Sequence, residues 1–231
     1  MRYFSISIAI LMIMVAAVTW GCRHVDTSVY LSVDKVTAGI FLEPRERTVL
    51  PPGMAYRGVY DKGIQLTKEM EGFVPQLYND AAQYCTIAYG HLVKLAPCDG
   101  SEPERFLDGV TEPEGEDLLR GDMTTAEAVV LTNVDVTLTD GQYAALCDFV
   151  YNVGGGNFRR STLLKVVNRN DFDEVPFQLR RWVKAGGRVL AGLERRRERE
   201  IELFFENVEI PRALPPAGTD LSPVDIREGE S

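Results

Sequence analysis

The stretch EGFVPQLYNDAAQYCT, Glu71 to Thr86, decides the predicted fold, because an amphipathic helix ends in it and a short β-prone segment follows. Two carboxylates, Glu71 and Asp80, stand nine residues apart, and Thr86 follows six residues after the second. Asn79 and Asp80 favour a turn. A hairpin or small sheet beside the helix would therefore bring Asp80 and Thr86 back across from Glu71.

The helix predicted over 61–74 directs its two neighbouring glutamates differently. Placing residues about every 100° gathers the apolar side chains on one half of the circumference. Glu71 falls inside that apolar arc, whereas Glu69 falls in the polar arc. An inward carboxyl group in a partly apolar setting can stay protonated near neutral pH, as a general acid must. The alternative is that Glu71 is only a capped or salt-bridged helix end.

The rest of the folded region is predicted to be short β structure followed by helices. Residues 84–89 are β-prone, and 95–109 form a turn-rich loop. Thr111 and Glu114 have the spacing of a capping box, and Gly154 to Gly156 are expected to end a buried central helix. We therefore predict one α+β domain with a cleft between a small β element and a mostly helical lobe. Helices are predicted from 111, near 124–127, and over 140–151, 161–168, 171–182 and 193–205.

The two ends of the chain are predicted to lie outside this domain. Residues 1–22 are apolar after one arginine and are interpreted as a signal peptide or membrane anchor, so we expect export. Cys22 directly follows Gly21, as in lipid-attachment sites, which leaves lipidation, anchoring and cleavage open. Residues 23–55 are interpreted as a linker and 56–211 as the domain. The Pro-rich, acidic stretch 212–231 is interpreted as a disordered tail.

Charge is divided along the chain. The net charge of −9 argues against nonspecific binding to nucleic acid or to anionic membranes. Residues 61–148 hold 5 Lys/Arg against 17 Asp/Glu, a net of −12, whereas 158–199 hold 12 against 5, a net of +7. The basic half can face an anionic or zwitterionic substrate. The cluster Arg195 to Arg197 is interpreted as a solvated helix face.

The four cysteines and two histidines predict no metal site and no cofactor. The sequence has no C-x-x-C pair, which makes a zinc site improbable. Cys85 and Cys98 could close a small loop after export, a possibility that the sequence leaves open. Cys147 lies in an apolar helical run and is expected to be buried. His91 is interpreted as a structural partner of an acidic side chain.

Four blocks in order make the sequence resemble the phage-type lysozymes (endolysins), the muramidases that cut peptidoglycan. The first is the spacing of Glu71, Asp80 and Thr86, and the resemblance covers about 155 residues. It departs from the family pattern Gly-x-Gly-His at Ala88, and a positive φ there would cost alanine about 1 kcal/mol. The other blocks are TIAYGHL (86–92), FVYNVGGGNFRRSTLL (149–164) and RWVKAGGRVLAGLERRRERE (181–200).

The resemblance implies a role for each matching residue. Glu71 would protonate the leaving glycosidic oxygen, while Asp80 and Thr86 would hold the attacking water. It also implies peptidoglycan glycan strands as the substrate, an inverting reaction and a monomer, with membrane contact only through the N-terminal segment. Whether such an enzyme serves phage release, wall remodelling or killing of competitors stays open. The implied substrate-binding residues are Leu92, Tyr151, Ser161 and, as a looser match, Gln178.

Three other functions compete with hydrolysis. The first is a wall-binding protein that has lost catalysis, because fold alone does not fix function. The second is a lytic transglycosylase, although such enzymes lack the second carboxylate that Asp80 supplies. The third is a thiol amidase or peptidase that uses Cys85 with His91.

Overall fold

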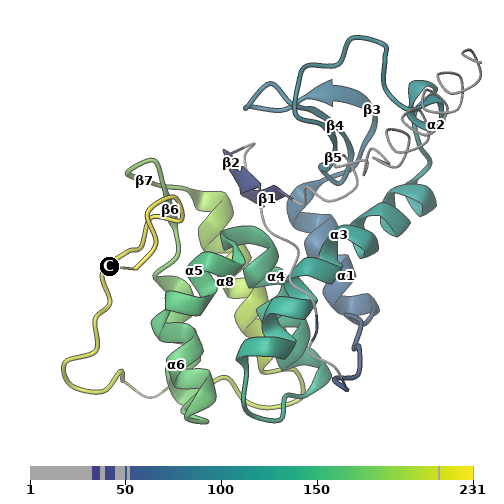
Figure 1. Ribbon diagram of the computed structural model, residues 1–231. Coiled ribbons are helices and arrows are strands. Elements are labelled where there is room, and N and C mark those ends of the chain that lie inside the picture. Colours follow the sequence, from purple (N-terminus) through teal and green to yellow (C-terminus); the bar gives the residue numbers. More distant parts are fainter. Residues whose placement is uncertain (1–32, 37–39, 45–49, 51–52, 213, 231) are drawn as a thin grey trace, which may run out of the picture. The chain divides into compact units, whose positions relative to one another are not determined.

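The computed structural model describes residues 33–36, 40–44, 50, 53–212 and 214–230 (Figure 1). The predicted signal or anchor segment, 1–22 with Cys22, lies outside these residues. Within the predicted linker, β1 (Val33–Val36) and β2 (Ile40–Pro44) pair antiparallel. In the part of the chain that is described, no helix combines the length and the apolar character that crossing a membrane requires.

The first helix ends where the sequence changes from helical to extended. α1 (Asp61–Glu71) stops at Gly72, which has φ +71° and donates its N–H to the carbonyl of Lys68. Glycine adopts such a conformation without a steric penalty. The helix is thus three residues shorter than predicted, because Val74 already begins the first strand of the sheet. Glu71 is left as the last helical residue.

The predicted β element is a three-stranded antiparallel sheet of β3 (Val74–Asn79), β4 (Cys85–Ala88) and β5 (His91–Lys94), in that order. A disulfide joins Cys85 to Cys98, so the loop that the sequence left open is closed. The following loop contains the short helix α2 (Glu104–Leu107). Thr86 pairs with Tyr78 on one side and with Leu92 on the other. Directly paired residues share a face, so these three side chains form one row across the sheet.

The helical lobe is built around α4 (Asp140–Val153), which packs against α1, α3 (Glu112–Asn133) and α8 (Ala191–Phe204). The predicted capping box of Thr111 and Glu114 begins α3. Phe149 and Trp182 are fully buried and meet edge to face, with ring centroids 5.4 Å apart. Cys147 is buried as predicted. The α+β architecture is therefore confirmed.

The remaining helices follow the predicted order with shifted limits. Gly154 ends α4, but Gly155 and Gly156 already belong to the next helix. Ser161, where a helix was predicted to begin, is the N-cap of α6. A hairpin of β6 (Lys184–Ala185) and β7 (Arg188–Val189) follows α7 and was not predicted. The short elements are α5 (Gly155–Arg160), α6 (Thr162–Asn168), the 3-10 turn η2 (Phe172–Glu174) and α7 (Val175–Arg180).

Two predictions about exposed segments are wrong. Within the predicted disordered tail, Val224 and Ile226 are buried, and Asp225 forms a parallel bridge with Lys184. Arg196 and Arg197 are fully buried, whereas their neighbour Arg195 is exposed as expected. The reason is helical phase, because both arginines lie on the face of α8 that also carries Leu193, Ile201 and Phe204.

Candidate active site

Glu71 is held by a buried arginine. Its side chain is only 8% exposed, and its Oε1 lies 2.7 Å from Nη1 of Arg196. The same guanidinium binds Asp148 with two nitrogens, at 2.8 Å and 2.9 Å. Thr67 donates a 2.6 Å hydrogen bond to Asp148 from one turn earlier in α1. Glu71 is directed inward as predicted, and it is also the salt-bridged helix end that was the alternative, because it ends α1 and pairs with Arg196.

The electrostatics of this cluster depend on its burial. Burial alone would raise the pKa of Asp148, yet the guanidinium of Arg196 lowers it. A charged carboxylate inside a protein needs such a partner. Asp148 therefore keeps its charge and fixes the orientation of Arg196, which in turn fixes the carboxylate of Glu71.

A second buried pair lies behind the first. Nη2 of Arg197 bonds both to Oε1 of Glu200, at 2.7 Å, and to the amide oxygen of Asn152. The guanidinium also lies over the ring of Phe149, 4.9 Å from its centroid. Burial raises the pKa of Glu200 well above its ordinary value and lowers that of Arg197 to about 10. Glu200 is thus the carboxyl of this cluster that most favours its protonated form.

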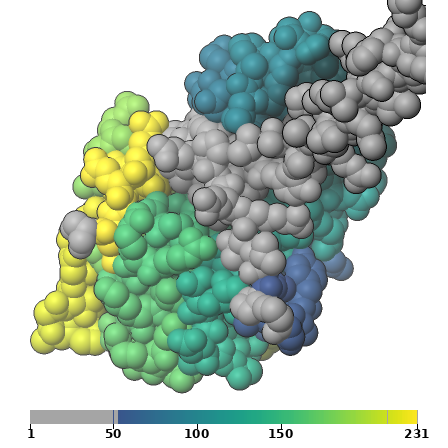
Figure 2. All heavy atoms as spheres, viewed as in Figure 1, coloured from purple at the N-terminus to yellow at the C-terminus, as the bar shows by residue number. Residues whose placement is uncertain are grey.

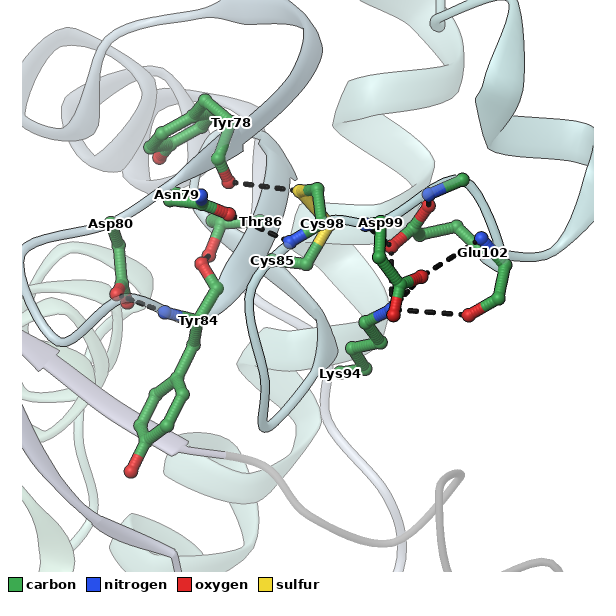
Figure 3. The surroundings of a disulfide bond; sticks show 12 residues. Tyr78, Asn79, Asp80, Tyr84, Cys85, Thr86, Lys94, Cys98, Asp99 and Glu102 are labelled. Carbon is green, nitrogen blue, oxygen red and sulfur yellow. Dashed lines mark hydrogen bonds and ion pairs between the residues drawn. A yellow bond between two sulfur atoms is a disulfide. The ribbon is translucent and has the colours of Figure 1, made fainter.

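Asp80 is held in a different way, by the backbone of a turn. Its Oδ1 accepts hydrogen bonds from the N–H groups of Ala82 and Tyr84, both at 2.9 Å. The backbone bond from Asp80 N to the carbonyl of Tyr84 closes the turn, and Figure 3 shows the carboxylate of Asp80 directed at the N–H of Tyr84. Such Asx turns are local in sequence. They fix the carboxylate at the edge of the sheet, beyond β3.

The sheet carries Thr86 and Leu92 beside these carboxylates. Thr86 is buried and donates a 3.1 Å hydrogen bond to the carbonyl of Tyr84, while Leu92 is half-buried on β5. Burial raises the pKa of the Tyr78 hydroxyl, and the negative charges of Asp80 and Glu71 add to the effect. Glu71 precedes β3 and Asp80 directly follows it, so β3 joins the helix-end carboxylate to the turn carboxylate.

The predicted contacts on the helical lobe lie at different depths. Tyr151 is half-buried on α4, and burial together with the charges of Asp122 and Glu71 raises the pKa of its hydroxyl. Ser161 is fully buried and caps α6 by accepting from the N–H of Leu164. Gln178 is also buried, with its amide oxygen 2.9 Å from Arg181. Tyr151 is thus partly exposed, whereas Ser161 and Gln178 offer no surface to a ligand in this conformation.

Further expectations concern His91, the cysteines and Ala88. His91 lies 3.0 Å from the carboxylate of Asp122, which is the acidic partner that the sequence predicts. The disulfide leaves Cys85 without a free thiol, so the thiol amidase or peptidase hypothesis is wrong. Among the described residues, Cys85, Cys98 and Glu102 are grouped closely enough for a metal, but both sulfurs are used in the disulfide. Ala88 adopts φ +58°, the positive angle that its departure from the family pattern put in question.

Sequence reasoning missed the buried arginines, although a signal was present. Leu193, Arg196, Glu200 and Phe204 recur at helical spacing with Arg197 and Ile201 beside them. The same placement by 100° steps that turned Glu71 inward also turns these charged residues inward. Charged residues are rarely buried without partners, so the pattern predicts acidic partners on the helices that face α8.

The phage lysozyme family model matches residues 68–200, more than half of the chain. The chain belongs to the phage lysozyme family. It is 35% identical over 150 residues to an endolysin of Acyrthosiphon pisum secondary endosymbiont phage 1, covering 63% of this chain and 97% of that one. It is 38% identical over 131 residues to the SAR-endolysin of Bacteriophage PS119, covering 57% and 74%.

Solved structures agree with this membership. The muramidase domain of SpmX from Asticaccaulis excentricus is 31% identical with a TM-score of 0.55, covering 63% of this chain and 96% of that one. A P22 lysozyme structure is 29% identical with a TM-score of 0.56, covering 64% and 98%. This family member is accordingly a glycoside hydrolase, a lysozyme that acts on peptidoglycan.

Proposed function

We propose that this lysozyme is an exported N-acetylmuramidase that hydrolyses the β-1,4 bond between N-acetylmuramic acid and N-acetylglucosamine. The observation that carries the proposal is a pair of carboxylates in different settings, Glu71 on the buried Arg196 and Asp80 on the backbone of a turn. Two carboxyl groups in unequal environments are what glycoside hydrolysis uses. Export rests on the apolar segment 1–22 and on relatives that are named SAR-endolysins.

In this mechanism, Glu71 gives its proton to the glycosidic oxygen as the bond breaks. Arg196, already 2.7 Å away, stabilises the carboxylate that remains on Glu71. The carboxylate of Asp80 is held in place by two backbone N–H groups that bind its Oδ1. It positions a water molecule for attack on the anomeric carbon together with Thr86. Leu92 and Tyr151 would contact the sugar chain from the two sides of the site.

The decisive experiment compares Glu71→Gln with its neighbour Glu69→Gln. Glu69 is exposed and pairs with Arg199, so it matches Glu71 in chemistry but not in position. Turnover of purified peptidoglycan should fall by about 10²- to 10⁴-fold in E71Q and stay near the wild-type rate in E69Q. Retained turnover in a folded E71Q protein would remove the assignment of Glu71.

Product analysis separates hydrolysis from its nearest chemical rival. Mass spectrometry of the released fragments should show free reducing ends, because water attacks the anomeric carbon. Anhydro-sugar ends would instead indicate a lytic transglycosylase, and sacculus binding without release of sugar would indicate a non-catalytic wall-binding protein.

A further inference from the structure

The C-terminal strap, residues 220–230, lies outside the stretch that the family model matches, which ends at residue 200. Its centre is fixed by backbone bonds and apolar burial. Val224 N donates to the carbonyl of Arg181, and Ile226 N donates to that of Lys184. Asn157 donates a 2.7 Å hydrogen bond to the carbonyl of Ile226. Figure 2 shows these residues, in yellow, against the green surface of the helical lobe.

Two carboxylates of the strap bind Arg181, whose side chain is only 6% exposed. Glu230 accepts from Nη1 of Arg181 and Asp220 from Nη2, both at 2.9 Å. The second oxygen of Glu230 accepts from the N–H and the hydroxyl of Thr162, at 2.7 Å and 2.6 Å. The strap thus places the carboxylate of Glu230 in a cradle formed by the guanidinium of Arg181 and by Thr162.

Beside this cradle lies the basic hollow, a cavity of about 650 Å³ between the strap, α5, α6 and the β6–β7 hairpin. Arg160, Lys165 and Lys184 lie along its wall. No described carboxylate forms an ion pair with Lys165 or Lys184. Five cationic and four acidic side chains line the hollow, with Asp225 and Glu228 among the acidic ones. Its lining therefore keeps a small excess of positive charge, next to a carboxylate that already occupies its cradle.

The two predicted substrate contacts that are buried adjoin this strap. Ser161 directly precedes Thr162, which binds Glu230, and Gln178 accepts from the same Arg181. The part of the helical lobe that carries these residues is thus occupied by the protein's own acidic residues. Peptidoglycan presents carboxylates of its own, on the peptide stems that branch from the glycan.

We propose that the basic hollow binds the carboxylate-bearing peptide stems of peptidoglycan, and that Glu230 is an internal ligand that competes with them. The proposal rests on peptidoglycan as the substrate and not on the role of Glu71. Displacing Glu230 leaves Val224 and Ile226 in place, so the strap stays attached while its acidic end gives way to an external carboxylate.

The test measures sedimentation of the protein with purified sacculi, in the E71Q background so that hydrolysis does not remove the target. E230Q weakens the internal ligand and should tighten binding about threefold, whereas K165Q/K184Q should weaken it about fivefold. Both effects should shrink as salt is raised. The controls are E209Q and R212Q, which remove the charges of an exposed pair outside the hollow. Neither should change binding.

A second target identifies the ligand. Glycan strands stripped of peptide stems by an amidase should bind wild type, E230Q and K165Q/K184Q equally. If the three proteins still bind stripped strands with different affinities, the proposal is overturned. It is also overturned if their affinities for sacculi become equal only after wall phosphate is removed, because the ligand would then be phosphate. Unchanged binding of E230Q to intact sacculi would overturn the competition. Because binding is measured here and turnover in the test of Glu71, the two proposals fail independently.

Discussion

The two carboxylates proposed to act together are held by opposite means. Glu71 depends on side chains from two other helices, because Arg196 reaches it from α8 and is itself fixed by Asp148 of α4. Asp80 depends on backbone N–H groups two and four residues further along its own turn. The acid is therefore a product of long-range packing and the water-positioning group a product of local sequence. Mutations that weaken the contacts of Glu71 should therefore affect a different part of the protein from mutations that weaken the turn at Asp80.

The largest expected effect is the loss of Arg196. Arg196→Met leaves Asp148 and Glu71 inside the lobe without their cation, and breaking such a buried pair costs about 3 to 5 kcal/mol. Urea unfolding of purified protein measures this loss. Arg195→Met, the exposed neighbour on the same helix, should change stability by less than about 0.5 kcal/mol. Equal stability of the two variants would mean that Arg196 does not support the acid side of the site.

Next in size is the disulfide that closes the sheet beside Asp80. Cys98→Ser removes a link between residues 13 apart, which in chain-entropy terms stabilises by about 3 kcal/mol. Thermal unfolding measures the change, and hydrogen exchange should rise first in β3 to β5. Dithiothreitol should lower the stability of the wild type in the same way and leave C98S unaffected. If hydrogen exchange instead rises first in α4 and α8, the structures that hold Glu71 and Asp80 are not independent of each other.

These two tests also mark what the sequence could and could not predict. The turn at Asp80, the cap at Thr111 and the cap at Ser161 are local, so residue type and spacing sufficed. The partners of Glu71 stand up to 125 positions away, and no local pattern names them. Helical phase nevertheless predicts that Arg196 faces inward, so the error there was to treat a charge cluster as solvated without placing it on the helix.

The missed elements of the basic half have a related cause. β6 and β7 are two residues long, too short for a period of two to show. Their Gly186-Gly187 turn, with φ +58° and +78°, is the kind that joins hairpins and was the available signal. The strap was judged by composition, which is acidic and Pro-rich, yet burying Val224 and Ile226 is enough to attach it.

A smaller effect should appear as a pH dependence on the acid side. The folded pKa of Glu200 is raised by burial, so its contribution to stability is present below the unfolded pKa and is lost as pH rises toward the folded value. The slope is about 1.4 kcal/mol per pH unit. Glu200→Gln removes this titration. The free energy of unfolding of the variant, relative to that of the wild type, should therefore rise between pH 5 and pH 7, roughly the range just above an ordinary glutamate pKa. Glu198→Gln, exposed on the same helix, should parallel the wild type.

The smallest effect tests the sheet at Ala88, the last residue of β4, which pairs with Val74 of β3. Its φ of +58° costs an alanine about 1 kcal/mol relative to glycine. Its buried methyl group packs toward Gly115, where an added Cβ would lie 3.1 Å away, and losing that methyl offsets part of the gain. Ala88→Gly should therefore stabilise the protein by less than about 1 kcal/mol in urea unfolding. A clear loss of stability would mean that contact with α3, and not backbone strain, decides which residue this strand end accepts.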